Sequence, residues 1–280
     1  MRPLASPTLA LAALLLATGT LAAQGRGRRS SQSDEEWLEQ CREGRYGNRG
    51  DERACEVRDV PVRRDVKSLS LDGSALGGIS VTSWDRDSVH VSARMQTWAN
   101  TQAEAERSLK AIRIVAEGGT IRATGPRGDA SERNRWSVSY DVWVPRRMDL
   151  DLRAHNGGIR VDGVSGRMTL DTENGGIALL GAGGDVRAHT QNGGLNVQLE
   201  GKKWDGTGLD AETENGGVRL SVPDGYSARL ETGTVNGGIR TDIPVTLSGN
   251  ISRRISLTLG SGGAPVRAMT TNGGVIIQRD

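Results

Sequence analysis

Apolar and polar positions alternate along the C-terminal part of the chain in a frame that repeats. The tripeptide Asn-Gly-Gly followed by an aliphatic residue marks each repeat, and its asparagines are Asn156, Asn174, Asn192, Asn215, Asn236 and Asn272. Successive asparagines are 18, 18, 23, 21 and 36 positions apart. Because 36 is twice 18 and Arg254 stands where a skipped Asn would fall, we expect an 18-residue coil with an additional, Asn-free coil near Arg254.

Aligning the repeat on its Asn produces columns of apolar or β-branched residues. Six positions before the Asn lie Leu150, Met168, Val186, Leu209, Leu230 and Val266. Three positions after it lie Ile159, Ile177, Leu195, Val218, Ile239 and Val275. Two positions before it lie Ala154, Thr172, Thr190, Thr213, Thr234 and Thr270. A unit of two short strands cannot bury its apolar side alone, whereas units stacked about 4.8 Å apart form a continuous core. We therefore predict an all-β fold, a parallel β-solenoid of about 18-residue coils over residues 148–280.

The Asn-Gly-Gly corners have their own chemistry. The two glycines allow a positive φ at a sharp corner, and an Asn at the same place on each coil can pass side-chain hydrogen bonds along the stack. A meander of Asn-Gly hairpins is the alternative, but it gives no reason for residues 18 apart to share chemistry. The longer steps of 23 and 21 residues contain Gly201–Gly206 and Pro223–Tyr226, which we expect to be loops.

Upstream of the repeat, residues 67–147 alternate in short segments typical of strands and form the N-terminal part of the same domain. One helix interrupts them, because Thr101 and Glu104 form a capping box and Ala105, Leu109 and Ile112 follow at helical spacing. We expect this short helix to cap one end of the solenoid. Residues 24–66 are a polar lead-in, for which we expect little regular structure as far as about Val60.

The N-terminus has the pattern of a secretory signal peptide over residues 1–23. Met1 and Arg2 precede an apolar stretch from Leu9 to Leu16, and small residues follow up to Ala23. We therefore expect export to the periplasm, the cell surface or the medium, with no transmembrane segment in the mature chain. In an oxidising compartment, the only two cysteines, Cys41 and Cys55, should form a disulfide, which contributes about 3 kcal/mol for this loop length.

Composition narrows the range of partners. The chain carries 36 basic and 34 acidic residues, a formal charge of +2, and it has no basic block of the kind that follows a phosphate backbone. We therefore expect no nucleic-acid partner. Phe is absent and Gly reaches 39 residues, which suits a narrow core of stacked aliphatic side chains. No cofactor or metal motif is present.

One outward surface gathers ionisable side chains. Positions one and three before the Asn place six of them on one face of four adjacent coils: His155, Asp171, Glu173, His189, Glu212 and Glu214. The simplest interpretation is a solvated polar face, and contact with a divalent cation or a glycan is the alternative. Glu173 and Glu214 would lie roughly 9.6 Å apart, within the range of an inverting glycosidase, but a flat face does not desolvate its carboxylates.

Aromatic side chains define a second candidate surface. Trp143 is expected to point to the opposite side of its strand from Trp136, Val138 and Tyr140. Together with the loop residues Trp204 and Tyr226, it could stack on sugar rings. The alternative is that these rings cover a cap or the end of a coil.

Several segments between Lys67 and Asp280 together form a recognisable pattern: the helix near Thr101–Leu109, the segment Val142–Pro145, the repeated Thr-x-Asn-Gly-Gly, the loop Val222–Tyr226, Gly262-Gly263 and the closing Thr271–Val275. In these residues the sequence resembles the putative adhesin family of bacterial β-strand repeat proteins. The family is a domain of unknown function, so the resemblance implies an exported β-solenoid of adhesin or envelope type and brings no catalytic residues.

We therefore expect a non-catalytic surface adhesin, envelope scaffold or binding module, with a surface glycan or an envelope protein as its partner. A polysaccharide-active enzyme on the same scaffold is the first alternative, and it would need a cleft with convergent polar groups. A structural protein that self-associates through its coil ends is the second, because a solenoid leaves strand edges unless they are capped.

Overall fold

The structure is a computed structural model, and it describes residues 33–44, 51–73, 76–126, 136–242 and 253–280. The predicted signal peptide and the predicted start of the mature chain near Gln24 lie outside these residues. Asp34–Asp280 forms one compact unit. Within the described residues, no helix is both long enough and apolar enough to cross a membrane.

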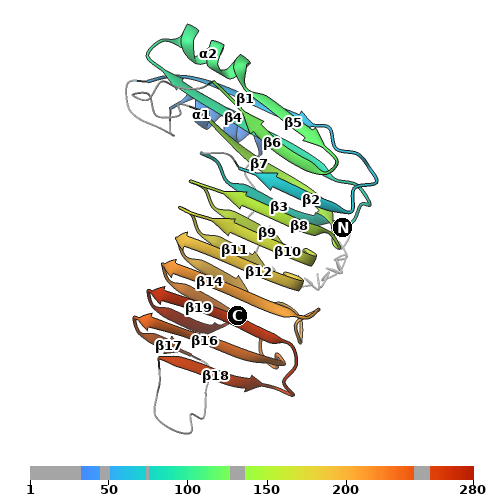
Figure 1. The fold of residues 1–280 in the computed structure, drawn as a ribbon, viewed down its shortest axis with the longest axis vertical. Coiled ribbons are helices and arrows are strands. Elements are labelled where there is room, and N and C mark those ends of the chain that lie inside the picture. The colour runs from blue at the N-terminus through green and yellow to red at the C-terminus, as the bar shows by residue number, and fades with distance from the viewer. Residues whose placement is uncertain (1–32, 45–50, 74–75, 127–135, 243–252) are drawn as a thin grey trace, which may run out of the picture. The chain divides into compact units, whose positions relative to one another are not determined.

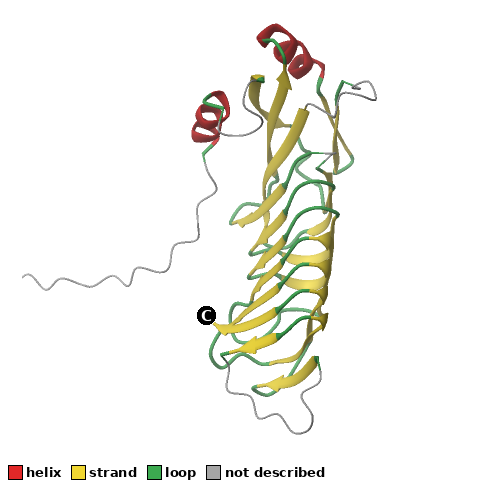
Figure 2. Ribbon diagram, turned by 90° about the vertical axis from the view of Figure 1, so that its left-hand side faces the viewer, coloured by secondary structure: helices red, strands yellow, loops and turns green. Residues whose placement is uncertain are grey.

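The strands of this unit form two sheets, A and B, of ten strands each, with their inward side chains between them (Figures 1 and 2). In spatial order, sheet A consists of β1 (Glu52–Val60), β4 (His90–Ala99), β7 (Trp136–Pro145), β3 (Ile79–Trp84), β9 (Ile159–Asp162), β11 (Ile177–Leu180), β13 (Leu195–Gln198), β15 (Val218–Val222), β20 (Val275–Arg279) and β17 (Ile239–Thr241). Sheet B consists of β18 (Arg254–Leu259), β16 (Ala228–Asn236), β19 (Pro265–Asn272), β14 (Gly208–Asn215), β12 (Gly183–Asn192), β10 (Ser165–Thr172), β8 (Asp149–Ala154), β2 (Ser68–Asp72), β6 (Thr120–Thr124) and β5 (Arg113–Glu117).

Each Asn-Gly-Gly repeat consists of one strand of sheet B, a corner and one strand of sheet A. We call this combination a repeat unit. Units pair in parallel and in the predicted register, so that Met168 lies between Leu150 and Val186. All six residues of the first apolar column are buried, as is every residue two positions before the Asn. The column after the corner is also buried, except for the half-buried Ile239. The inward columns predicted from the sequence are therefore confirmed. The predicted loops at 201–206 and 223–226 are confirmed too, since both lie between strands.

The corners are joined by a ladder of asparagine amides. Nδ2 of Asn174 donates to Oδ1 of Asn156 at 3.0 Å, and the same bond continues to Asn192, Asn215, Asn272 and finally Asn236. In every Asn-Gly-Gly unit except the first, which has Ala154, the threonine two positions before the Asn adds a hydrogen bond to the backbone, as when Thr190 Oγ1 donates to the Gly175 carbonyl at 2.7 Å. The expected hydrogen-bond ladder is thus confirmed.

The reason for the corner glycines differs from the prediction. None of the glycines that follow the repeat asparagines is among the described glycines with a positive φ. The first glycine of each corner is required by close stacking instead: a Cβ on Gly175 would lie 2.3 Å from the Gly157 carbonyl oxygen, and one on Gly193 would lie 2.1 Å from that of Gly175. Any larger residue would push adjacent units apart.

The prediction of a purely parallel solenoid is only partly met, because both sheets are mixed. The repeat units pair in parallel, whereas β1, β4 and β7 pair antiparallel at one end of sheet A. In sheet B the antiparallel pairs are β5 with β6 and β16 with β18. The fold is therefore all-β with a parallel central portion and antiparallel ends.

The expected coil at Arg254 is wrong. The segment Arg254-Ile255-Ser256 has no Gly-Gly, so it cannot make the close corner, and it continues as the straight strand β18, antiparallel to β16. The last unit, β19 and β20, does not extend the stack. It is inserted between the two preceding units, with β19 between β14 and β16 and β20 between β15 and β17.

The N-terminal segment has more regular structure than its composition predicts. Helix α1 (Asp34–Arg42) and strand β1 are formed, so the expectation of little regular structure is wrong for these residues. The predicted disulfide between Cys41 and Cys55 is present and joins the two. Asp34 of α1 pairs with Arg94 on β4, whose guanidinium also pairs with Asp141 on β7 at 2.9 Å.

The predicted capping helix is α2 (Gln102–Ala111). Thr101 is its N-cap and accepts a hydrogen bond from the Glu104 amide at 3.3 Å, as the capping box predicts. Its buried residues Ala105 and Leu109 belong to the core, and the helix contacts β1 and β4 at one end of sheet A.

Candidate binding surface

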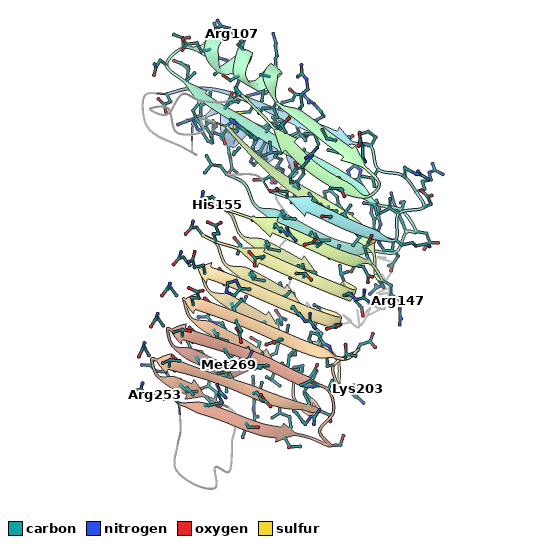
Figure 3. The ribbon with its side chains drawn as sticks, in the orientation of Figure 1. Arg107, Arg147, His155, Lys203, Arg253 and Met269 are labelled. Carbon is teal, nitrogen blue, oxygen red and sulfur yellow. A yellow bond between two sulfur atoms is a disulfide. The ribbon has the colours of Figure 1, made fainter. Side chains whose placement is uncertain are left out.

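The outward side of β8, β10, β12, β14, β19 and β16 in sheet B carries the predicted ionisable residues, and we call it the charged face. The alternation of the strands points the Thr column inward and its neighbours outward. His155, Asp171, Glu173, His189, Glu212 and Glu214 are accordingly all on this face. Figure 3 shows His155, just beyond the end of β8, and Met269 on β19, several strands apart in this sheet.

The two histidines of the charged face contact carboxylates on neighbouring units. His155 Nδ1 lies 2.6 Å from Glu173 Oε2. His189 lies between two units, with Nδ1 3.5 Å from Asp171 Oδ2 and Nε2 3.8 Å from Glu214 Oε1. Their side chains are 45–54% exposed. The predicted residues are therefore brought together as pairs along the stack rather than around one point.

Two further carboxylates of this side of sheet B, on β14, contact an arginine that the sequence did not identify. Arg267, on the inserted strand β19, contacts both Asp210 and Glu212 on β14. Partial burial lowers the pKa of Arg267, but its hydrogen bonds to Glu212 and Asp210 outweigh that effect and raise it. Arg267 was missed because it faces Asp210 only when the last unit is inserted beside β14.

The carboxylates of the charged face have nitrogen partners on neighbouring units. Glu212 contacts the guanidinium of Arg267, and Asp171, Glu173 and Glu214 each lie within 4 Å of a histidine ring nitrogen. Among the described residues, no group of three or more His, Cys, Asp or Glu side chains is arranged to hold a metal ion. The geometry gives the cation alternative no support, and this face can instead offer donors and acceptors to a macromolecular partner.

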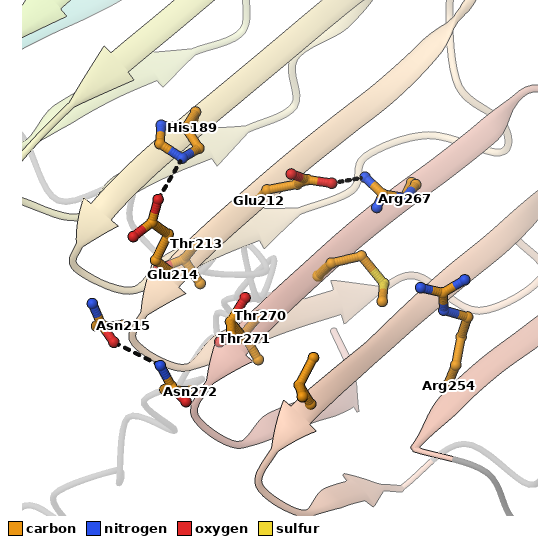
Figure 4. A pocket seen from close by; sticks show the side chains of 12 residues that line it. His189, Glu212, Thr213, Glu214, Asn215, Arg254, Arg267, Thr270, Thr271 and Asn272 are labelled. Carbon is orange, nitrogen blue, oxygen red and sulfur yellow. Dashed lines mark hydrogen bonds and ion pairs between the residues drawn. The ribbon is translucent and has the colours of Figure 1, made fainter.

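A groove of about 460 Å³ interrupts the charged face near the inserted unit. Figure 4 shows His189, Glu212 and Glu214 on one side of it and Arg254 on the other, with Arg267 also lining it. Met269 on β19 and Val235 on β16 line it too, and their strands lie between β14 and β18. Val235 is 56% exposed, and it is the one large hydrophobic residue at the surface among the described parts of the chain.

The groove follows from two departures from the repeat pattern. Gly233 occupies the position three before Asn236, where other units carry a side chain, and Val235 occupies the position next to that Asn. Insertion then places Met269 beside Gly233, and its Cε lies 3.0 Å from where a Cβ of Gly233 would be. On β14 the corresponding positions carry Glu212 and Glu214, so among the described units the apolar side chains gather at β16 and β19.

Two of the three predicted sugar-stacking residues are not available for stacking. Trp204 is 5% exposed, and its indole Nε1 donates to the Gly184 carbonyl at 2.9 Å. Tyr226 is 3% exposed, and burial raises the pKa of its phenol to about 12. Both rings pack on the core, which is the covering role given as the alternative. Trp143 remains half-buried on the outer side of sheet A.

Comparison with solved structures finds similar chains at low sequence identity. A putative cell adhesion protein from Clostridium sporogenes is 10% identical, with a TM-score of 0.44, over 82% of this chain and 100% of that one. A putative adhesin from Bacteroides fragilis is 12% identical, with a TM-score of 0.33, over 81% and 97%. No curated protein matches the chain. The sequence profile of one family matches residues 74–278, which is most of the chain, and this protein therefore belongs to the Toastrack DUF4097 family.

Proposed function

We propose that the protein is an exported, non-catalytic binding module, of surface-adhesin or envelope-scaffold type, which contacts its partner through the charged face around the groove. The observation that supports the proposal is the solvent exposure of the Val235 side chain. This aliphatic side chain is exposed in a structure whose described large hydrophobic residues are otherwise buried or half-buried.

The surroundings of Val235 have the composition of a protein interface. Val235 and Met269 supply an apolar centre, and ionisable residues from neighbouring units supply a polar rim. Binding energy concentrates in such desolvated centres, whereas rim contacts mainly exclude water. Met also adapts its shape to a partner, because its side chain is unbranched and flexible.

The carboxylates of the charged face support binding more than turnover. An inverting glycosidase needs one carboxylic acid held neutral by its environment and a second carboxylate across the substrate. Glu173 contacts His155 and Glu214 contacts His189, on different units, and all four side chains are about half exposed. Two carboxylates held in separate pairs do not converge on a single scissile bond.

Export is part of the proposal. The disulfide between Cys41 and Cys55 joins α1 to β1, and such bonds persist in oxidising compartments. The expected signal peptide over residues 1–23 would deliver the chain there. Protein recovered from outside the cytoplasm should therefore begin near Gln24 and have an intact mass two hydrogens below that of the reduced chain.

The binding surface is tested with the mature chain by biolayer interferometry against immobilised collagen, fibronectin and peptidoglycan. Val235→Arg places a charge in the apolar centre, and we expect it to weaken the interaction that the native chain shows by at least about tenfold. The matched control is Thr169→Arg, which adds the same side chain to an exposed position on the outer side of β10.

Two results would contradict the proposal. Equal affinities of the Val235→Arg and Thr169→Arg variants would remove the groove from the binding surface. Release of soluble sugar from the peptidoglycan, lost in a Glu173→Gln, Glu214→Gln double variant, would establish the enzyme alternative instead.

A further inference from the structure

Three aromatic rings form a row on the outer side of sheet A, on strands far from the charged face. The rings belong to Trp84 at the end of β3, His90 at the start of β4 and Trp143 on β7. The ring centroids of Trp84 and His90 are 6.2 Å apart, and those of His90 and Trp143 are 5.2 Å apart. The rings are tilted by 30° and 38°, which is an attractive aromatic geometry.

Strand pairing explains how these rings meet. β7 lies between β3 and β4, and His90 is directly opposite Trp143 in the antiparallel pair (Figure 1). Trp84 is opposite Pro145 in the parallel pair, so its ring reaches across β7 to contact His90. The row therefore spans three adjacent strands.

The Trp84 ring is held in place by the turn that follows it. Its Nε1 donates to the Ser88 carbonyl at 2.8 Å, and the guanidinium of Arg86 lies 4.7 Å from its ring centroid. Asp85 of the same turn pairs with Arg146, just beyond β7, at 2.9 Å. These contacts preorganise the row, which lowers the entropic cost of binding a ligand.

The row is accessible and has a mixed polar rim. The imidazole of His90 is 43% exposed, and both indoles are half-buried. Asp59, whose Oδ1 lies 3.7 Å from His90 Nε2, and Asp85 supply two carboxylates at the rim. Arg86 and Arg146 supply two guanidinium groups, so the four formal charges cancel.

We propose that this aromatic row is a binding platform for a neutral oligosaccharide. The C–H faces of sugar rings pack on aromatic rings, and sugar hydroxyls need both donors and acceptors at the edge of the contact. Because carboxylates at least balance the guanidinium groups of this rim, with the exposed Asp87 in the same turn as Asp85, it favours a neutral polyhydroxyl ligand over an anionic one. This platform is on a different sheet from the groove, so the result of its test does not depend on whether the proposed function is correct.

The test is isothermal titration of the mature chain with chitohexaose, cellohexaose and maltohexaose as neutral probes, with hexagalacturonate as the anionic probe. We expect at least one neutral hexasaccharide to bind, more tightly than hexagalacturonate, and to change the tryptophan fluorescence. Trp143→Ala should weaken this binding by at least about tenfold, and Trp143→Phe, which keeps a ring, by less. Thermal unfolding of both variants shows whether they remain folded.

Two control variants separate the platform from general effects. Trp98→Ala removes a half-buried tryptophan from the opposite end of β4, and Val235→Arg alters the groove on sheet B. Both should retain affinity within about twofold. Failure of all three neutral probes to bind, or equal affinity of the folded Trp143→Ala and Trp98→Ala variants, would overturn the proposal. Tighter binding of a proline-rich decapeptide than of any saccharide would overturn it as well.

Discussion

The position of the last repeat unit can be tested by comparing the same substitution at two isoleucines. Ile277 on β20 is fully buried, between Leu220 on β15 and Thr241 on β17. Ile239 on β17 is half-buried, because β17 is the last strand of sheet A. If the units were stacked in chain order, Ile239 would be internal and Ile277 would lie at the end.

The expected magnitudes follow from burial. Ile277→Ala leaves a cavity between two units and should cost about 2–5 kcal/mol. Ile239→Ala removes the same atoms from a half-exposed site and should cost about 1 kcal/mol. Both values are measured by guanidinium unfolding followed by far-ultraviolet circular dichroism. The dependence of the unfolding free energy on denaturant concentration should be the same in both variants and in the native chain. A larger loss for Ile239→Ala than for Ile277→Ala would show that the unit is not inserted.

Three further predictions concern charge, the disulfide and calcium. Burial raises the pKa of Asp141 despite the nearby Arg94, so the folded state binds the proton of this carboxyl more tightly than the unfolded state does. The native chain therefore loses free energy of unfolding as the pH rises through the folded-state pKa of Asp141. The stability of Asp141→Asn relative to the native chain should therefore increase from pH 4 to pH 7 in chemical unfolding, and a constant difference would contradict this. Replacing Cys41 and Cys55 with Ser should cost about 3 kcal/mol in the same assay, and reducing agent should then have no further effect. Calcium should leave the melting temperature unchanged, since Glu173 and Glu214 contact different histidines on different units and do not surround one point; a rise that is lost when both are changed to Gln would establish the cation alternative.

The sequence predicts the core of the repeat units well because burial imposes a strict period. Val186 must face inward on β12 if Ala188 and Thr190 do, and all three are buried. The Asn ladder is equally predictable, since residues 18 apart come into register when units stack. One unit was not recognised as such: β2 and β3 share a Gly77-Gly78 corner, but Leu76 takes the place of the Asn, opposite Asn156.

The order of the units could not be predicted from the repeat itself. Every Asn-Gly-Gly unit presents the same apolar column and the same amide, and β19 pairs with β14 on one side and with β16 on the other. The informative signal was the missing Gly-Gly after Arg254, which rules out a corner, because adjacent backbones approach too closely there for any Cβ. A repeat position without Gly-Gly therefore indicates a strand that continues without a corner, as β18 does. The next unit, β19 and β20, is then inserted between the two units that precede it.

The candidate surfaces could be predicted only in part, because strand alternation gives the side of a sheet on which a residue lies but not the order of the units. Strand alternation fixed the side on which His155 and Glu173 lie, but not the partner of Glu212, since Arg267 is 55 positions away in sequence and meets it only by insertion. The loop aromatics Trp204 and Tyr226 could not be distinguished from exposed ones, because loop sequence does not show whether a ring turns back onto the core.

Regularity and irregularity have different consequences in this fold. Where the pattern is regular, outward polar side chains contact side chains of the next unit, as at His155 and Glu173. Where it is interrupted, at Gly233 and Val235, the face has an apolar groove whose exposed valine no described residue covers. An unsatisfied apolar centre gains most from a partner, whereas paired surface charges gain little. The functional surface of a repeat protein of this kind should therefore be sought at the interruptions of its repeat rather than at its most regular columns.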